Sequence, residues 1–133
     1  GFYKHKAEDI VLACRMLRDE YGGKVPGTME QLLRLPGVGR KTANLLLGDI
    51  YKVPGSVVCD THCIRICGKL GLSHGKEPEK VEQQLRKILP PEKSNDFCHR
   101  LVLFGREICT ARSPKCGQCP LSPFCLEANP EAK

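Results

Sequence analysis

Four cysteines near the C-terminus are the residues whose spacing most clearly allows chemistry. Cys109, Cys116, Cys119 and Cys125 form a Cys-x6-Cys-x2-Cys-x5-Cys run. Four thiolates in one loop repel each other unless they bind a metal centre, and four cysteine ligands suit an iron–sulfur cluster or tetrahedral zinc. Zinc sites usually join two Cys-x2-Cys pairs, whereas this run has only one. The spacing therefore favours a 4Fe-4S cluster over zinc, and favours unliganded thiols least.

A glycine-rich segment is the second place where chemistry is expected. It reads Leu35-Pro36-Gly37-Val38-Gly39-Arg40-Lys41. Two glycines one residue apart allow a tight turn with exposed amide groups, and the next helix starts with its positive dipole end at the same place. This suits a phosphate group. The segment lacks the P-loop spacing and follows a helix rather than a strand, which disfavours a nucleotide cofactor. An ordinary glycine turn is the alternative.

The elements that position these residues are predicted to be helical. Apolar residues recur at helical spacing, Thr28 with Gln31 forms a capping box, and Asp60 or Thr61 can cap a later helix. The expected helices cover residues 6–21, 28–33, 40–50, 78–88 and 94–109, with one more that carries Ile64 to Leu70. No alternating apolar pattern is long enough to predict a strand. The expected fold class is all-α.

Composition and charge narrow the protein class. The 133 residues, 41% of them apolar, are enough for one packed core. A formal charge of +6 favours an anionic partner, although 27% charged residues also suit an ordinary soluble surface. The sequence shows neither a signal peptide nor a membrane span, and it has nine cysteines, an odd number. We therefore expect a soluble, intracellular protein that uses cysteines for metal rather than for disulfides.

Taken together, the motifs resemble those of a known family. Residues 35–41 resemble the helix-hairpin-helix of the endonuclease III superfamily, and Val58-Cys59-Asp60-Thr61-His62 resembles that family's aspartate segment at the expected distance. The cysteine run resembles the family's C-terminal iron–sulfur loop. The resemblance implies the glycosylase fold of this superfamily, with residues 1–52 as the C-terminal part of the six-helix barrel domain and residues 53–133 as a helical iron–sulfur cluster domain.

The resemblance begins at Gly1 in the middle of the family's barrel, so the chain is expected to lack the N-terminal helices. Apolar faces that those helices would cover should then be exposed. These faces include parts of Ile10, Cys14, Leu17, Leu45, Leu46 and Leu47. Because large exposed apolar patches are rare on monomers, we expect self-association, a separate N-terminal segment or repacking of the remaining helices to cover them.

By analogy with the family, Lys41 would be the nucleophile and Asp60 the essential carboxylate. Physical arguments agree with these roles. The helix dipole and Arg40 disfavour the protonated amine of Lys41, and Asp60 can stabilise positive charge that develops on the sugar. The simpler roles are a solvated surface lysine for Lys41 and a helix N-cap for Asp60.

The resemblance implies base-excision DNA repair by a glycosylase for oxidised pyrimidines with abasic-site lyase activity, on double-stranded DNA. The alternatives are a non-catalytic DNA-binding iron–sulfur fragment, a monofunctional mismatch glycosylase and an iron–sulfur redox protein. Arg112 and Lys115 lie in the six-residue gap of the cysteine run, where they can contact backbone phosphates. The candidate DNA contacts are Gly37, Val38, Gly39, Arg40, Arg112 and Lys115.

The remaining cysteines are expected to pack in the core. Free cysteine is among the most buried residue types, and Cys14, Cys63, Cys67 and Cys98 lie on apolar faces of predicted helices. Cys59, beside Asp60, is the one that could be partly exposed and reactive.

Overall fold

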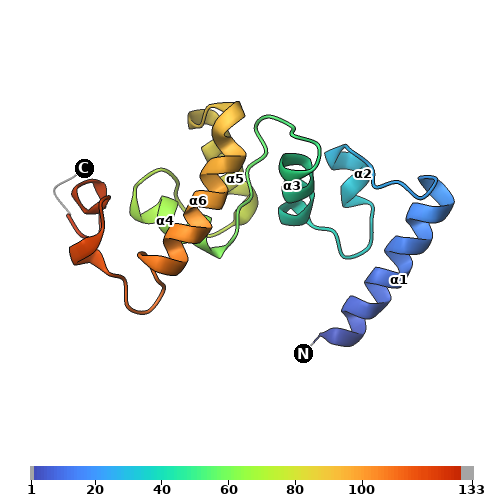
Figure 1. The fold of residues 1–133 in the computed structure, drawn as a ribbon, viewed down its shortest axis with the longest axis horizontal. Coiled ribbons are helices and arrows are strands. Elements are labelled where there is room, and N and C mark those ends of the chain that lie inside the picture. The colour runs from blue at the N-terminus through green and yellow to red at the C-terminus, as the bar shows by residue number, and fades with distance from the viewer. Residues whose placement is uncertain (1, 130–133) are drawn as a thin grey trace. The chain divides into compact units, whose positions relative to one another are not determined.

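The computed structural model describes residues 2–129, so Gly1 and residues 130–133, the outer ends of the two expected domains, lie outside the described residues. The described residues form six α-helices and three short 3-10 helices, without a β-strand, and the all-α class is confirmed (Figure 1). The α-helices are α1 Tyr3–Glu20, α2 Met29–Leu33, α3 Arg40–Asp49, α4 Thr61–Lys69, α5 Pro78–Ile88 and α6 Ser94–Glu107. The 3-10 helices are η1 Pro91–Lys93, η2 Cys116–Gln118 and η3 Ser122–Phe124.

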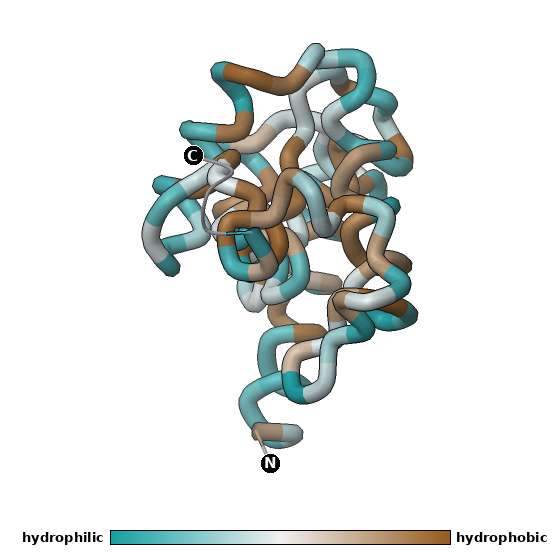
Figure 2. Tube along the Cα trace, turned by 90° about the vertical axis from the view of Figure 1, so that its left-hand side faces the viewer, coloured by the Kyte–Doolittle hydropathy of each residue, from teal (hydrophilic) through white to brown (hydrophobic). Residues whose placement is uncertain are grey.

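Along the trace, hydrophobic and hydrophilic residues are interspersed, as expected of helices that bury one face (Figure 2). None of the helices within residues 2–129 combines the length and the apolar character that a membrane span requires. The chain divides into two compact units, Gly1–Val53 and Pro54–Lys133. The assignment of residues 1–52 to a barrel domain and of 53–133 to an iron–sulfur domain stays a prediction.

The first unit contains α1, α2 and α3 around a small core of Leu32, Leu35, Ala43 and Leu47. Thr28 caps α2 as predicted, because the amide of Gln31 donates to Thr28 Oγ1 at 3.3 Å. The Gln31 side chain accepts from the Thr28 hydroxyl at 3.0 Å instead of bonding the Thr28 amide as in a full capping box. The cap satisfies one amide that the helix start would otherwise leave without a partner.

Much of α1 remains uncovered. It has no buried residue, and Ile10 is 64% exposed. Only Met16, Leu17 and Tyr21, at its C-terminal end, pack against the small core. The prediction that Cys14 is a core residue is therefore wrong: its face of the helix is apolar, but no described residues bury it.

The expected exposure of the leucines in α3 is only partly correct. Leu45 is exposed, whereas Leu46 is partly buried and Leu47 is buried in the core. Consecutive helical residues point in directions about 100° apart, so three successive leucines cannot share one face.

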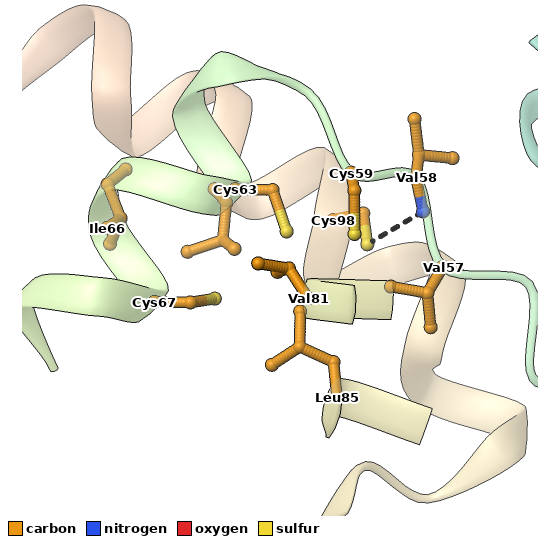
Figure 3. Close-up of a cluster of buried hydrophobic side chains, with 10 residues drawn as sticks. Val57, Val58, Cys59, Cys63, Ile66, Cys67, Val81, Leu85 and Cys98 are labelled. Atoms are coloured by element: carbon orange, nitrogen blue, oxygen red, sulfur yellow. Dashed lines mark hydrogen bonds between the residues drawn. The ribbon is translucent and has the colours of Figure 1, made fainter. Parts of the chain in front are cut away.

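The second unit contains α4, α5 and α6 around a larger core. Its buried residues are Val57, Val58, Cys59, Cys63, Ile66, Cys67, Val81, Leu85, Cys98 and Leu101. Figure 3 shows that the segment before α4 and helices α4, α5 and α6 all supply side chains to this cluster. Cys63, Cys67 and Cys98 are buried as predicted, and Cys59, for which partial exposure was considered, is buried too.

Candidate functional site

The glycine-rich segment forms a tight connection between α2 and α3. The amide of Leu35 donates to Leu32 O and that of Val38 donates to Leu35 O, both at 3.1 Å. Gly37 has a φ of 73°, a conformation that glycine adopts without strain. A Cβ at Gly37 would also lie 2.9 Å from the Cβ of Asp9 in α1. The turn therefore requires glycine at position 37 for two independent reasons.

The start of α3 presents positive charge. Gly39 is its N-cap residue, no side chain caps the helix, and no acidic residue lies in the first turn. Lys41, the second residue of α3, is exposed. Because the first amide groups of a helix point outward at its positive dipole end, this end of α3 suits an anion such as a phosphate.

Asp60 is the N-cap of α4. Its Oδ1 accepts a hydrogen bond from the backbone amide of Cys63 at 2.8 Å. The side chain is partly exposed, and within the described part of the chain only this one carboxylate oxygen has a hydrogen bond. Asp60 therefore is a helix N-cap, the simpler role expected for it, and its Oδ2 atom remains available to a substrate.

Helix α4 also contacts the start of the cysteine run through Arg65, which sequence reasoning did not single out. The Arg65 guanidinium donates to the carbonyl oxygen of Cys109 at 2.7 Å and lies 3.3 Å from His62 Nδ1. Both side chains lie directly against Gly105 of α6, where a Cβ would overlap the His62 ring. Nothing in the spacing of Arg65 and Gly105 along the sequence indicates this contact, because it depends on how α4 and α6 pack.

The four cysteines of the run line one cavity of about 400 Å³. They come from the segment just after α6, from η2 and its C-cap, and from the residue after η3. Backbone hydrogen bonds hold the loop, among them Lys115 N to Ile108 O at 2.9 Å and Leu126 N to Lys69 O at 2.8 Å. All nine cysteines are free thiols. The predicted ligand set is thus gathered around one space.

The cavity fits a cluster of several atoms better than a single ion. Within residues 2–129, no three Cys, His, Asp or Glu side chains are arranged to hold one metal ion. The cavity is much larger than the roughly 30 Å³ that one water molecule occupies. An iron–sulfur cluster takes its four cysteines at separate irons, so those thiols need not converge on one point.

Comparison with known proteins identifies both motifs. Residues 20–48 match the family model of the helix-hairpin-helix motif, and residues 109–125 match that of the iron-sulfur binding domain of endonuclease III. The chain is 42% identical to endonuclease III of Escherichia coli strain K12 over 94% of this chain and 59% of the relative. It is 40% identical to endonuclease III of Bacillus subtilis over the whole of this chain and 61% of the relative.

The chain is similar to members of the endonuclease III family over nearly all of its own length. Its expected iron–sulfur cofactor is confirmed, because the matched iron–sulfur domain runs from Cys109 to Cys125. The chain spans about 60% of the length of these relatives.

Solved structures of the family agree with the fold. An endonuclease III in a non-covalent complex with DNA superposes with a TM-score of 0.90 at 42% identity, over 96% of this chain and 60% of that chain. An endonuclease III from a trapped covalent intermediate with DNA, an estranged-adenine complex, gives 0.91 at 40% identity, over 100% and 62%. A thermostable thymine-DNA glycosylase gives 0.77 at 26% identity, over 92% and 58%.

Basic side chains lie at and near the cysteine cavity. Lys69 and Lys115 line it, and Arg112 is exposed in the same loop. Lys69 forms an ion pair with Glu127 at 2.8 Å. The hydrogen bond from Lys69 to the Glu127 carboxylate raises the pKa of Lys69, with smaller contributions from Cys109 and Cys125. Lys69 is thus held as a cation beside the cysteines.

The structure locates the predicted residues in two groups. Residues 37–41 lie in the first unit, and Asp60, the four cysteines, Arg112 and Lys115 lie in the second. Within the second unit, Arg65 connects the helix that Asp60 caps to the first cysteine of the run.

Proposed function

We propose that this chain acts in base-excision DNA repair as a DNA glycosylase with abasic-site lyase activity. Its substrate would be double-stranded DNA that contains an oxidised pyrimidine or an abasic site. The observation that carries the proposal is the exposed Lys41 at the uncapped start of α3, directly after the helix-hairpin-helix turn. The two relatives solved with DNA support it, one of them as a trapped covalent intermediate.

In this proposal the Lys41 amine is the nucleophile. Its nitrogen bonds to C1′ of the damaged nucleotide while the bond from C1′ to the base breaks, and the base leaves with a proton. Ring opening of the sugar then gives a Schiff base. The Schiff base acidifies a proton on C2′, and loss of that proton expels the 3′ phosphate by β-elimination. At an abasic site the same amine adds to the C1′ aldehyde of the ring-opened sugar, and loss of the aldehyde oxygen as water gives the same Schiff base without a base to remove.

Asp60 would act on charge and protons. The sugar develops positive charge as the base departs, and a carboxylate close to it stabilises that charge. The cap from Cys63 fixes the side chain through Oδ1, so Oδ2 is the oxygen that would meet the sugar or accept a proton. Capping and catalysis therefore use different oxygens of one group.

DNA would be held through its phosphates. The turn residues Gly37, Val38, Gly39 and Arg40 lie at the positive end of α3, which suits one phosphate. Arg112 and Lys115 are exposed in the cysteine loop and would contact others. Phosphate contacts position a protein on the duplex without reading its sequence.

Cys109, Cys116, Cys119 and Cys125 would ligate the iron–sulfur cluster. When bound, the cluster fixes the shape of the loop that presents Arg112 and Lys115. The purified protein should absorb broadly in the visible range, and Cys116→Ser should lose this absorbance and bound iron. Cys14→Ser, which changes an exposed cysteine outside the run, should keep both. A colourless wild-type protein with one bound zinc would contradict the ligand assignment.

Borohydride trapping tests the nucleophile. Reduction of the Schiff base joins protein and abasic-site DNA covalently, so the wild-type chain should give a cross-linked product. Lys41→Gln should give essentially none, although it still binds the DNA. Lys24→Gln changes an exposed lysine between α1 and α2 and should trap like the wild type. Equal trapping by Lys41→Gln and the wild type would refute the assignment.

The mismatch glycosylase alternative has one observation in its favour, the likeness to the thymine-DNA glycosylase. That chain shares 26% identity with this one, against 42% and 40% for the two endonuclease III structures. The same trapping experiment separates the two, because a glycosylase without lyase activity forms no Schiff base.

A further inference from the structure

A second group of four cysteines lies in the core of the second unit, apart from the cysteine run. Cys59, Cys63, Cys67 and Cys98 are 5%, 0%, 0% and 3% exposed. Cys63 and Cys67 belong to α4, Cys98 belongs to α6, and Cys59 precedes Asp60. Figure 3 shows the sulfur atoms of Cys59, Cys63 and Cys98 directed toward one another between the segment before α4, α4 and α6.

The thiols of Cys63 and Cys98 have different neighbours. The Cys63 sulfur lies beside those of Cys59 and Cys98 (Figure 3). The backbone amide of Val58 donates to Cys98 Sγ at 3.3 Å. Cys98 Sγ therefore accepts a backbone amide and has the Cys63 thiol as a neighbour. Apolar packing alone does not require donors directed at a sulfur atom.

This arrangement gives Cys63 and Cys98 different protonation tendencies. The hydrogen bond from Cys63 lowers the pKa of Cys98, against the opposing effect of burial, and the Val58 amide adds to the lowering. Hydrogen bonds with Cys59, Cys67 and Cys98, together with burial, raise the pKa of Cys63. Within this pair, the Cys98 thiol therefore has the lower pKa and loses its proton more readily than the Cys63 thiol.

The arrangement of these four thiols does not suit a shared metal ion. Within residues 2–129, no three ligand side chains are arranged to hold one ion. A disulfide needs only two adjacent sulfur atoms, and no disulfide is present among the nine cysteines. Disulfides in intracellular proteins are usually transient and redox-sensing or catalytic.

We propose that Cys63 and Cys98 form a two-electron redox site that closes to a disulfide with a small hydroperoxide. The Cys98 thiolate attacks one peroxide oxygen, the O–O bond breaks, and Cys98 becomes a sulfenic acid while the other oxygen leaves as hydroxide. The Cys63 sulfur then attacks the Cys98 sulfur, and the sulfenic oxygen leaves as hydroxide. The thiol protons convert the hydroxides to water. Both sulfurs are oxidised by one electron each, and hydrogen peroxide is reduced to two waters.

The new bond would join α4 to α6 directly beside the proposed carboxylate. The amide of Cys63 donates to Asp60, and the amide of Val58 donates to Cys98. Both ends of the disulfide are therefore one hydrogen bond from the 58–60 segment. The redox site itself does not depend on the proposed repair function, and its chemistry can be measured without DNA.

Burial makes the reaction slow. The peroxide reaches the pair only when the packing of α4 on α6 opens locally, so the exposed Cys14 should be oxidised first. Cys14 is therefore an internal reference for exposure to the oxidant.

Peptide mapping tests the proposal on the full chain with its cluster bound. The protein is incubated with hydrogen peroxide, and visible absorption is followed to sample it before the cluster is lost. Remaining thiols are alkylated, and trypsin then releases Cys98 in peptide 94–100 and Cys59 together with Cys63 in peptide 53–65. The expected result is a reducible cross-link between these two peptides, formed after Cys14 is oxidised.

Two matched variants assign the partner, since peptide 53–65 holds two cysteines. Cys59→Ala should keep the cross-link, and Cys63→Ala should lose it. Each variant removes one buried thiol, and circular dichroism checks that both remain folded. The proposal is overturned if Cys63→Ala keeps the cross-link. It is also overturned if the wild type forms no cross-link. For this outcome the incubation is continued to twice the time that complete oxidation of Cys14 takes.

Discussion

At the scale of single residues, Asp60 combines two roles that can be separated by substitution. Its Oδ1 caps α4 by accepting from Cys63, a structural role that any good N-cap residue can fill. The proposed chemical role needs the negative charge, which only a carboxylate supplies.

Asp60→Asn should keep stability and lose activity. Asparagine caps a helix about as well as aspartate, so the free energy of unfolding should change by less than about 0.5 kcal/mol. Without the charge, β-elimination at an abasic site should slow by roughly 100-fold or more. Asp60→Ala should lose the activity and also about 1 kcal/mol of stability. Chemical denaturation and single-turnover cleavage measure the two effects, and an active Asp60→Asn enzyme would refute the catalytic role.

Single residues differed in how far the sequence could predict them. The Asp60 cap and the burial of Cys63, Cys67 and Cys98 follow from helical spacing and cap preferences. Cys14 lies on an equally apolar face and is exposed, because spacing defines a face but not the element that covers it. The carbonyl of Cys109 that Arg65 binds is 44 positions away in sequence, which no local pattern reveals.

At the scale of elements, the helix starts were the most predictable feature. Thr28, Asp60 and Pro78 begin α2, α4 and α5 as predicted, since each has a side chain or ring suited to a helix N-terminus. Helix ends were less exact. Helix α6 ends at Glu107, two residues before its expected end at Cys109.

The turn between α2 and α3 provides a matched pair of glycines for a stability test. Gly37→Ala should lower the free energy of unfolding by about 1–2 kcal/mol or more, because alanine is strained at a positive φ and its Cβ would press on Asp9. Gly39 has a φ of −95°, and a Cβ there would meet no atom within 4 Å.

Gly39→Ala should therefore cost less than about 1 kcal/mol, the ordinary penalty of alanine at an N-cap. Urea denaturation of both variants measures the difference. Equal stabilities for the two would contradict both the positive φ at Gly37 and its close contact with Asp9.

At the scale of the whole molecule, the effect of the formal charge of +6 depends on where the basic groups lie. Arg112 and Lys115 are exposed in the loop that carries the cysteine run. The sequence could predict which loop carries them, because both lie between Cys109 and Cys116. It could not give the basic neighbour Lys69, which reaches the cavity from α4.

If these two residues bind phosphates, each should contribute to the salt dependence of DNA binding. Arg112→Ala or Lys115→Ala should weaken binding to all sequences alike and make the slope of log K against log salt shallower by about one. Lys87→Ala, which removes an exposed lysine in the last turn of α5, should leave the slope unchanged. Fluorescence anisotropy at several salt concentrations measures the slopes, and a loss confined to one DNA sequence would argue against phosphate contacts.

The close contact of Gly105 with His62 has a consequence for how this sequence can vary. A methyl group at position 105 would occupy the space of the His62 ring, so the two positions share one volume. Substitutions at them should therefore be coupled: alanine at 105 should be harmful beside histidine and nearly harmless beside a small residue at 62. Among related sequences, the two positions should then change together.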